Sequence, residues 1–192
     1  MTRESLQRLF LALPFERETI EAAAAFLKKS QENFPQLRWV HPADLHLTLH
    51  YFGLTEISRV PLIGECTRLA LQGQSPFLLQ ISGLGVFPED RAPRILWADV
   101  AGQRPAVSAL QQRLCASLRD AGFEVSAETF RPHVTLARGA PDEIQRALVS
   151  SGFPGLPSRK ISSIALFESR PSDKGQRYEI LETFALAPPP PQ

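Results

Sequence analysis

The stretch HLTLHYFG, residues 46–53, has a counterpart 87 residues further along, HVTLARG, residues 133–139. Both begin with the string His-x-Thr-Leu. With 4 histidines in 192 residues, chance predicts only about 0.02 copies of this string. Two copies therefore indicate a duplicated element, whose purpose is either structural or chemical.

The first copy has the alternating pattern of a β-strand. Side chains two residues apart lie on the same face of a strand, so this segment has one leucine-rich face to pack and one polar face for chemistry. If the alternation is strict, one face carries Leu45, Leu47, Leu49 and Tyr51, and the other carries His46, Thr48, His50 and Phe52.

The flanking sequence predicts helices and further strands around both copies. Helices are expected at 16–29, 56–72, 104–121 and 142–152. Strands are expected at 8–13, 77–87, 94–100, 131–138, 159–170 and 176–186, with residues 88–93 as a hairpin turn. The order βαβαββ followed by αβαββ predicts an α+β fold made of two similar lobes with little linker between them.

Composition is typical of a globular protein, with 43% hydrophobic residues and a formal net charge of +1. This small charge argues against a protein that tracks along duplex nucleic acid. We expect one domain over residues 1–187 and a disordered proline-rich tail over 188–192. With two cysteines, no signal peptide and no apolar run of membrane length, we expect a cytoplasmic protein, and a monomer.

A metal site is one reading of the histidines, but the strand pattern disfavours it. On a strand, His46 and His50 are about 13 Å apart at ~3.3 Å per residue, too far to share one ion. A serine or cysteine nucleophile is also disfavoured, because the chain has no Gly-x-Ser-x-Gly motif and neither cysteine has activating neighbours. His41, beside a proline, is expected to be a loop residue.

Two imidazoles from similar strands, each followed two residues later by a threonine, suit acid–base chemistry at phosphorus. One neutral and one protonated imidazole can act as general base and general acid. Threonine hydroxyls can donate hydrogen bonds to the oxygens of a phosphoryl group. The residues by themselves thus predict metal-free phosphoryl chemistry, with no cofactor.

The chain also resembles the two-histidine (2H) phosphoesterase superfamily, in particular its RNA 2′,3′-cyclic phosphodiesterase branch, also called 2′-5′ RNA ligases. The doubled motif is the specific part of this likeness, which covers nearly the whole chain. The other matching segments are RLFLALPF, WVHPAD, GLGVFPEDRAPRILWADV, FRPHVTLAR, IALFESR and YEILETF. The resemblance implies two pseudo-symmetric lobes, each an antiparallel sheet backed by helices, on either side of a V-shaped cleft.

The resemblance also implies roles for individual residues. His46 would be the proton donor and His133 the proton acceptor, while Thr48 and Thr135 would hold phosphate oxygens. Arg138 matches a phosphate-binding basic residue, although a regular strand would turn it away from His133. Either the strand is irregular near Gly139 or Arg138 is a rim residue.

Phe10 and Tyr178 are candidates for stacking on a base, with a role in the strand core as the alternative. The expected substrate is RNA with a 2′,3′-cyclic phosphate end, or a cyclic nucleotide, opened to a 2′-phosphate. The alternatives are a 2′-5′ RNA ligase, a 2′-5′ oligonucleotide phosphodiesterase and a non-catalytic module that binds RNA ends. Neither a membrane nor an obligate protein partner is expected.

Overall fold

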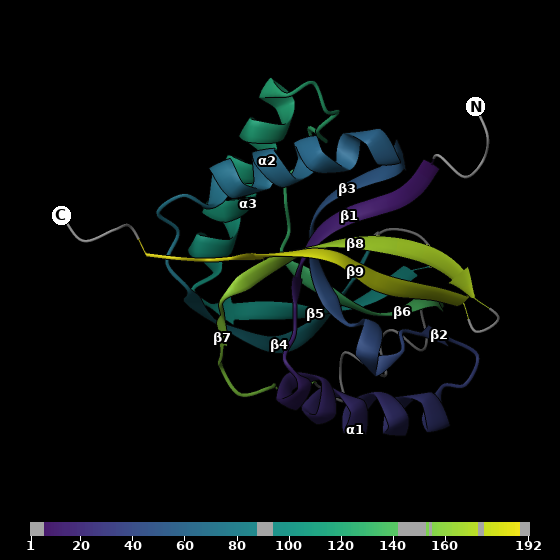
Figure 1. Cartoon of the computed structure of the whole chain (residues 1–192). Coiled ribbons are helices and arrows are strands. Elements are labelled where there is room, and N and C mark those ends of the chain that lie inside the picture. Colours follow the sequence, from purple (N-terminus) through teal and green to yellow (C-terminus); the bar gives the residue numbers. More distant parts are fainter. Residues whose placement is uncertain (1–5, 88–93, 142–152, 154, 173–174, 189–192) are drawn as a thin grey trace.

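Two antiparallel sheets each carry one copy of the motif (Figure 1). The computed structural model describes residues 6–87, 94–141, 153, 155–172 and 175–188. The first sheet has the order β3 (His46–Glu56), β1 (Leu6–Pro14), β8 (Ser163–Ser172), β9 (Gly175–Ala185). The second has the order β2 (Arg38–Trp39), β6 (His133–Ala140), β5 (Arg94–Gly102), β4 (Phe77–Phe87), β7 (Arg159–Ile161).

In the described residues, three α-helices lie on two sides of the molecule (Figure 1). They are α1 (Arg17–Asn33), α2 (Val60–Leu71) and α3 (Arg104–Asp120), and two short 3-10 helices occupy Pro42–Asp44 and Ile57–Arg59. Helices α2 and α3 pack together on one side, where α2 contacts β9 and α3 contacts β3, and α1 lies on the opposite side. Within the described residues, no helix is long and apolar enough to cross a membrane.

Helix α3 shows how the sequence pattern produces this packing. Its buried residues Val107, Leu110, Leu114 and Leu118 recur every three or four positions, so they form one apolar stripe. Gly122 follows the helix with a φ of 77°, a left-handed conformation that glycine adopts without strain. The predicted helix over 104–121 is therefore confirmed, with its apolar stripe in the core.

The two lobes are not the two halves of the sequence. The hairpin β4–β5 belongs to the first half of the chain, yet it joins the second sheet. The hairpin β8–β9 belongs to the second half, yet β8 pairs with β1 in the first sheet. The hairpin that follows the first motif therefore lies in the second sheet, and the hairpin that follows the second motif lies in the first sheet. The order of elements along the chain does not reveal this exchange.

Most predicted elements are present with shifted ends. The helix predicted over 56–72 is a 3-10 turn followed by α2, and the helix predicted over 16–29 extends to Asn33. The strand predicted over 159–170 is divided at Ser162 into β7 and β8, which belong to different sheets. The turn predicted at 88–93, the helix predicted at 142–152 and tail residues 189–192 lie outside the described residues.

Candidate active site

Hydrogen bonds at both ring nitrogens orient the side chain of His46. Its Nδ1 donates a hydrogen bond to the backbone carbonyl of Asp44, at 2.8 Å. In the neutral ring, Nε2 is then the acceptor, and it lies 3.1 Å from the hydroxyl of Thr48, which donates to it. The 3-10 helix Pro42–Asp44 ends where β3 begins, and so places this carbonyl under the ring. Nε2 is thereby left as the basic nitrogen beside the threonine.

His133 is oriented in the same way in the other lobe. Its Nδ1 donates to the backbone carbonyl of Arg131, also at 2.8 Å. In both motifs the accepting carbonyl belongs to the residue two positions before the histidine. A fixed Nδ1–H leaves Nε2 of each neutral ring able to accept a proton. The two imidazoles, when neutral, therefore have the same tautomer, with the proton on Nδ1.

A β-bulge at Leu49 corrects the predicted alternation in the first motif. Thr48 is opposite Ala12 and His50 is opposite Leu11, which leaves Leu49 without a partner on β1. A bulge of this kind reverses the alternation beyond it. His50 therefore lies on the core face with Leu11, where its ring packs against Phe52 at 4.5 Å, and not beside His46 as strict alternation predicted.

A second bulge, at Leu136, decides the orientation of Arg138. Thr135 is opposite Trp97 and Ala137 is opposite Leu96, so Leu136 has no partner on β5. Ala137 is fully buried, whereas Arg138 is exposed on the face that carries His133 and Thr135. Of the two alternatives for Arg138, the structure has the irregular strand. Arg138 consequently lies on the same face as His133.

Arg138 and Tyr178 connect the two lobes at this point. The phenol of Tyr178, on β9 of the first sheet, and Arg138, on β6 of the second, form a side-chain hydrogen bond. The charge of Arg138 also acts on His46 and on His133. We call the group formed by the two lobes the histidine site; its members are His46, Thr48, His133, Thr135, Arg138 and Tyr178.

The environment of the histidine site favours neutral imidazoles. Burial lowers the pKa of His46, and the nearby charge of Arg138 lowers it further, although the Asp44 carbonyl opposes both effects. Burial is also the main cause that lowers the pKa of His133, again assisted by Arg138 and opposed by the carbonyl of Arg131. Both rings are therefore mainly neutral at pH 7.

Aromatic rings support His46 on the first sheet. The ring of Phe10 stacks on Phe167 with centroids 5.0 Å apart, and it lies 4.8 Å from the ring of His46. Tyr178 meets His46 edge-on at 5.0 Å. Phe10 is only 3% exposed, so its ring is not available to a base, and the predicted stacking role is corrected in favour of the core alternative. Tyr178 is partly exposed, and stacking by this ring stays a prediction.

On the second sheet, His133 rests against Phe87 and Trp97. The Phe87 ring meets His133 edge-on at 5.0 Å and stacks on Trp97 at 4.8 Å. The indole lies flat over Gly85, where a Cβ atom would come within 2.2 Å of Trp97 Cζ2. Glycine at position 85 therefore makes room for the aromatic pair that holds the second histidine.

Sequence analysis placed Tyr51 on the wrong face of its strand. The phenol is 56% exposed and lies opposite Phe10, on the face that carries His46. Tyr51 is five residues after His46, just as Arg138 is five residues after His133. The equal spacing could have revealed this correspondence, but strict alternation placed Tyr51 on the packed face.

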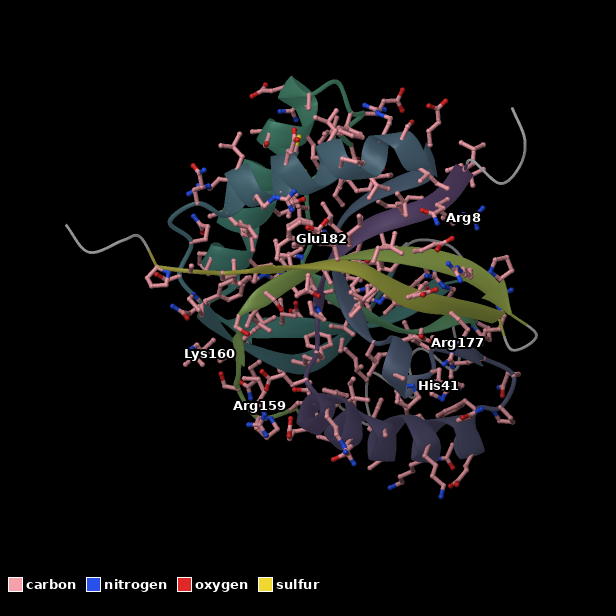
Figure 2. All side chains as sticks on the ribbon, in the orientation of Figure 1. Arg8, His41, Arg159, Lys160, Arg177 and Glu182 are labelled. Carbon is pink, nitrogen blue, oxygen red and sulfur yellow. The ribbon has the colours of Figure 1, made fainter. Side chains whose placement is uncertain are left out.

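Metal coordination finds little support in the described part of the chain. No group of three or more His, Cys, Asp or Glu side chains there could hold an ion. His46 and His50 lie on opposite faces of the sheet because of the bulge at Leu49. His41 caps the short helix Pro42–Asp44, where its Nδ1 accepts from the Ala43 N–H (Figure 2). It is a loop residue, as expected.

Comparison with known proteins agrees with this geometry. The family model described as the 2′-5′ RNA ligase superfamily matches residues 15–159. The chain belongs to this superfamily. Among the curated relatives of this 2′-5′ RNA ligase superfamily member, an RNA 2′,3′-cyclic phosphodiesterase of Aeropyrum pernix is 31% identical over 149 residues, which cover 76% of this chain and 84% of that protein.

Other relatives extend the likeness along the chain. An RNA 2′,3′-cyclic phosphodiesterase of Geobacillus stearothermophilus is 28% identical over 92% of this chain; the chain spans only 56% of that longer protein. The crystal structure of TT0787 from Thermus thermophilus superposes with a TM-score of 0.78 at 25% identity, covering 93% of this chain and 97% of that one. The predicted α+β fold, with two lobes that each contain an antiparallel sheet, is confirmed.

Proposed function

We propose that this 2′-5′ RNA ligase superfamily member is an RNA 2′,3′-cyclic phosphodiesterase that leaves a 2′-phosphate and needs no metal. The observation that carries the proposal is the matched orientation of the two imidazoles. Each ring is fixed through Nδ1 to a carbonyl, and residues of both lobes meet through Arg138. The activity named for the curated relatives supports the same reaction.

In the proposed reaction, His133 Nε2 takes a proton from water as the water oxygen attacks phosphorus. The bond from phosphorus to the ribose O3′ breaks, and His46 gives O3′ its proton. The products are a 2′-phosphate and a free 3′-hydroxyl. Thr48, Thr135 and Arg138 donate to the non-bridging oxygens, where negative charge increases in the transition state.

Substrate binding prepares His46 for its role as acid. Burial and Arg138 hold its pKa low in the free protein, so the ring starts mainly neutral. A cyclic phosphate brings one negative charge beside the ring, which favours the protonated form. His133 must instead stay neutral, and its lowered pKa suits a base. One anion can thus produce the mixed protonation state that the reaction needs.

The test is incubation of the full chain, with a chelator present, on an RNA oligonucleotide ending in a 2′,3′-cyclic phosphate. We expect a 2′-phosphate end from the wild type, and rates lower by roughly two to four orders of magnitude for His46→Ala and His133→Ala. Arg119→Ala is the control, because it removes an exposed side chain at the end of α3, outside the histidine site. Undiminished activity in both site variants would disprove the proposed mechanism.

Product analysis separates the other activities of this superfamily. A ligase would join the cyclic end to an added RNA with a 5′-hydroxyl, and a 2′-5′ phosphodiesterase would cut a 2′-5′-linked oligonucleotide. A binding module would retain the cyclic end without converting it. The orientation of both histidine rings favours turnover over simple retention, because binding an anion does not require two imidazoles with matched basic nitrogens.

A further inference from the structure

Arg38 stands directly opposite Arg138 in the second sheet. Strands β2 and β6 pair antiparallel with Arg38 facing Arg138 and Trp39 facing Ala137. Residues directly opposite in an antiparallel pair have side chains on the same face. Arg38 thus shares the face of Arg138, which is also the face of His133 and Thr135.

Burial on β2 independently supports this orientation. Leu37 is 4% exposed in the core, and Trp39 packs against the core with its indole N–H on the carbonyl of Phe34. Arg38, between them, is exposed. Since side chains alternate along a strand, its guanidinium points away from the core.

Arg38 and Arg138 place two positive charges directly opposite each other on neighbouring strands. Like charges directly opposite in a sheet are destabilising, unless something of opposite charge lies between or beside them. In the part of the chain that the structure describes, neither Arg38 nor Arg138 forms an ion pair with a carboxylate. Arginine pairs of this kind suit an external polyanion, because each guanidinium can bind a phosphate through two N–H groups.

The two arginines lie at different distances from the histidines. Arg138 acts on both imidazoles and bonds to Tyr178, so it serves the reacting phosphate. Arg38 is one strand further out, on the edge strand of the sheet, at a strand spacing of about 4.8 Å. A guanidinium one strand beyond Arg138 is within reach of a second phosphate, next to the one held at the histidine site.

We propose that Arg38 binds the phosphate on the 5′ side of the terminal nucleotide, so that the preferred substrate is an RNA chain rather than a nucleoside cyclic phosphate. The inference rests on the proposed function, because it places the cyclic phosphate at the histidine site. A nucleoside 2′,3′-cyclic phosphate with a free 5′-hydroxyl has no group for Arg38. A 5′-phosphate, or a preceding nucleotide, supplies one.

Three substrates test the proposal on the full chain. They are adenosine 2′,3′-cyclic phosphate, the same nucleotide with a 5′-phosphate, and the adenylyl dinucleotide with the cyclic end. For the wild type we expect kcat/KM to be about 10-fold or more higher for the second and third, as a charged hydrogen bond would produce. In Arg38→Ala this ratio should fall close to one, and Arg38→Lys should restore part of it.

The control variant is Arg119→Ala, which removes an exposed arginine at the end of α3, outside the histidine site. It should leave the substrate ratio as in the wild type. Equal kcat/KM for all three substrates in the wild type would overturn the proposal and leave the phosphodiesterase activity standing. A loss in Arg38→Ala that is the same for all three would also overturn it, because Arg38 would then act on the cyclic phosphate itself.

A binding measurement keeps the test independent of turnover. The probe is the adenylyl dinucleotide with a 3′-terminal 2′-phosphate, titrated at several salt concentrations. Each phosphate contact on a single strand contributes about 0.7 to the slope of log K against log salt. We expect Arg38→Ala to lower this slope by about that amount and Arg119→Ala to leave it unchanged. If the wild type hydrolysed none of the three substrates, the proposed function would fail, and an unchanged slope in Arg38→Ala would reject the role of Arg38 as well.

Discussion

Leu49 and Leu136 occupy the same place in the two lobes. Each follows the threonine of its motif, and each lacks a cross-strand partner in the pairing of its strand with β1 or β5. A second irregularity follows three residues later in both strands, at Phe52 and at Gly139. The pseudo-symmetry therefore includes the bulges, which give Tyr51 and Arg138 corresponding positions beside the two histidines.

Substitution of Arg138 should change both histidines at once. Arg138→Gln removes a positive charge that lowers the pKa of His46 and of His133, so both pKa values should rise. The activity should fall by about 10- to 100-fold with the loss of a charged donor. NMR titration of the histidine side-chain resonances measures the first effect and steady-state kinetics the second. Arg119→Gln is the control, and unchanged titration in Arg138→Gln would show that its charge does not reach the rings.

The pH dependence should differ between the free enzyme and its complex. Because burial lowers both histidine pKa values, the acid is mostly deprotonated in the free enzyme above about pH 6.5. The value of kcat/KM should therefore decline as the pH rises above this point. The alkaline limb of kcat should lie at higher pH, since the bound phosphate favours protonated His46. Rate profiles over about pH 5 to 9 check this order, and coincident alkaline limbs would contradict it.

A methyl group at position 85 should disturb the second histidine through its aromatic support. The Cβ of Gly85→Ala would come within 2.2 Å of the Trp97 ring, so the indole must move and Phe87 with it. We expect kcat to fall about tenfold through misplacement of His133, with a shift in tryptophan fluorescence. Gly64→Ala is the control, because there the atoms nearest to the new methyl are the flexible ends of Arg68 and Glu182, at 3.1 to 3.3 Å. A wild-type kcat in Gly85→Ala would show that Phe87 and Trp97 do not position His133.

His50 should make the fold sensitive to acid. Burial lowers its pKa to about 4, and its Nε2 has no hydrogen-bond partner among the described residues. Between about pH 6.5 and 4 the unfolded chain takes up a proton at His50 that the folded protein excludes, so the free energy of unfolding falls as the pH falls. The full effect is about 3 kcal/mol, because one pKa unit corresponds to about 1.4 kcal/mol.

The variant that tests this effect is His50→Leu, which has no proton to take up. Urea unfolding at pH 7 and pH 5 should show a smaller loss of stability in His50→Leu than in the wild type. Gln112→Ala, at an exposed position on α3, should lose as much stability between the two pH values as the wild type. If all three proteins lost the same amount, His50 would not be a source of the acid sensitivity.

Local patterns were sufficient to predict most of the strands and helices in the described residues, and the doubled motif, because each depends on residues close in sequence. The side of the sheet on which a residue lies was predictable only as far as the first bulge. Thr48 and Thr135 precede the bulges and lie as predicted, whereas His50, Tyr51 and Arg138 follow them. A bulge depends on how two strands align, and the pattern of one strand does not contain that information.

The sequence left two alternatives open for Phe10, base stacking and burial in the core, for a similar reason. An aromatic residue on a strand can face either a ligand or another ring, and its neighbour Phe167 is distant in sequence. The exchange of hairpins between the lobes is also a long-range feature. Pairing of β1 with β8 depends on the whole chain, while the repeat of elements suggested only that the lobes are alike.

The exchanged hairpins make the molecule indivisible. A chain cut between α2 and β4 would separate the two motifs, and neither piece could complete its own sheet, because β1 would lose β8 and β6 would lose β2. During synthesis, β1 cannot pair with β8 until more than 140 further residues have been added to the chain. Pairing between such distant strands slows folding. In the proposed reaction the two imidazoles can therefore act together only in a finished protein, and we expect a truncated product that carries one motif to be inactive.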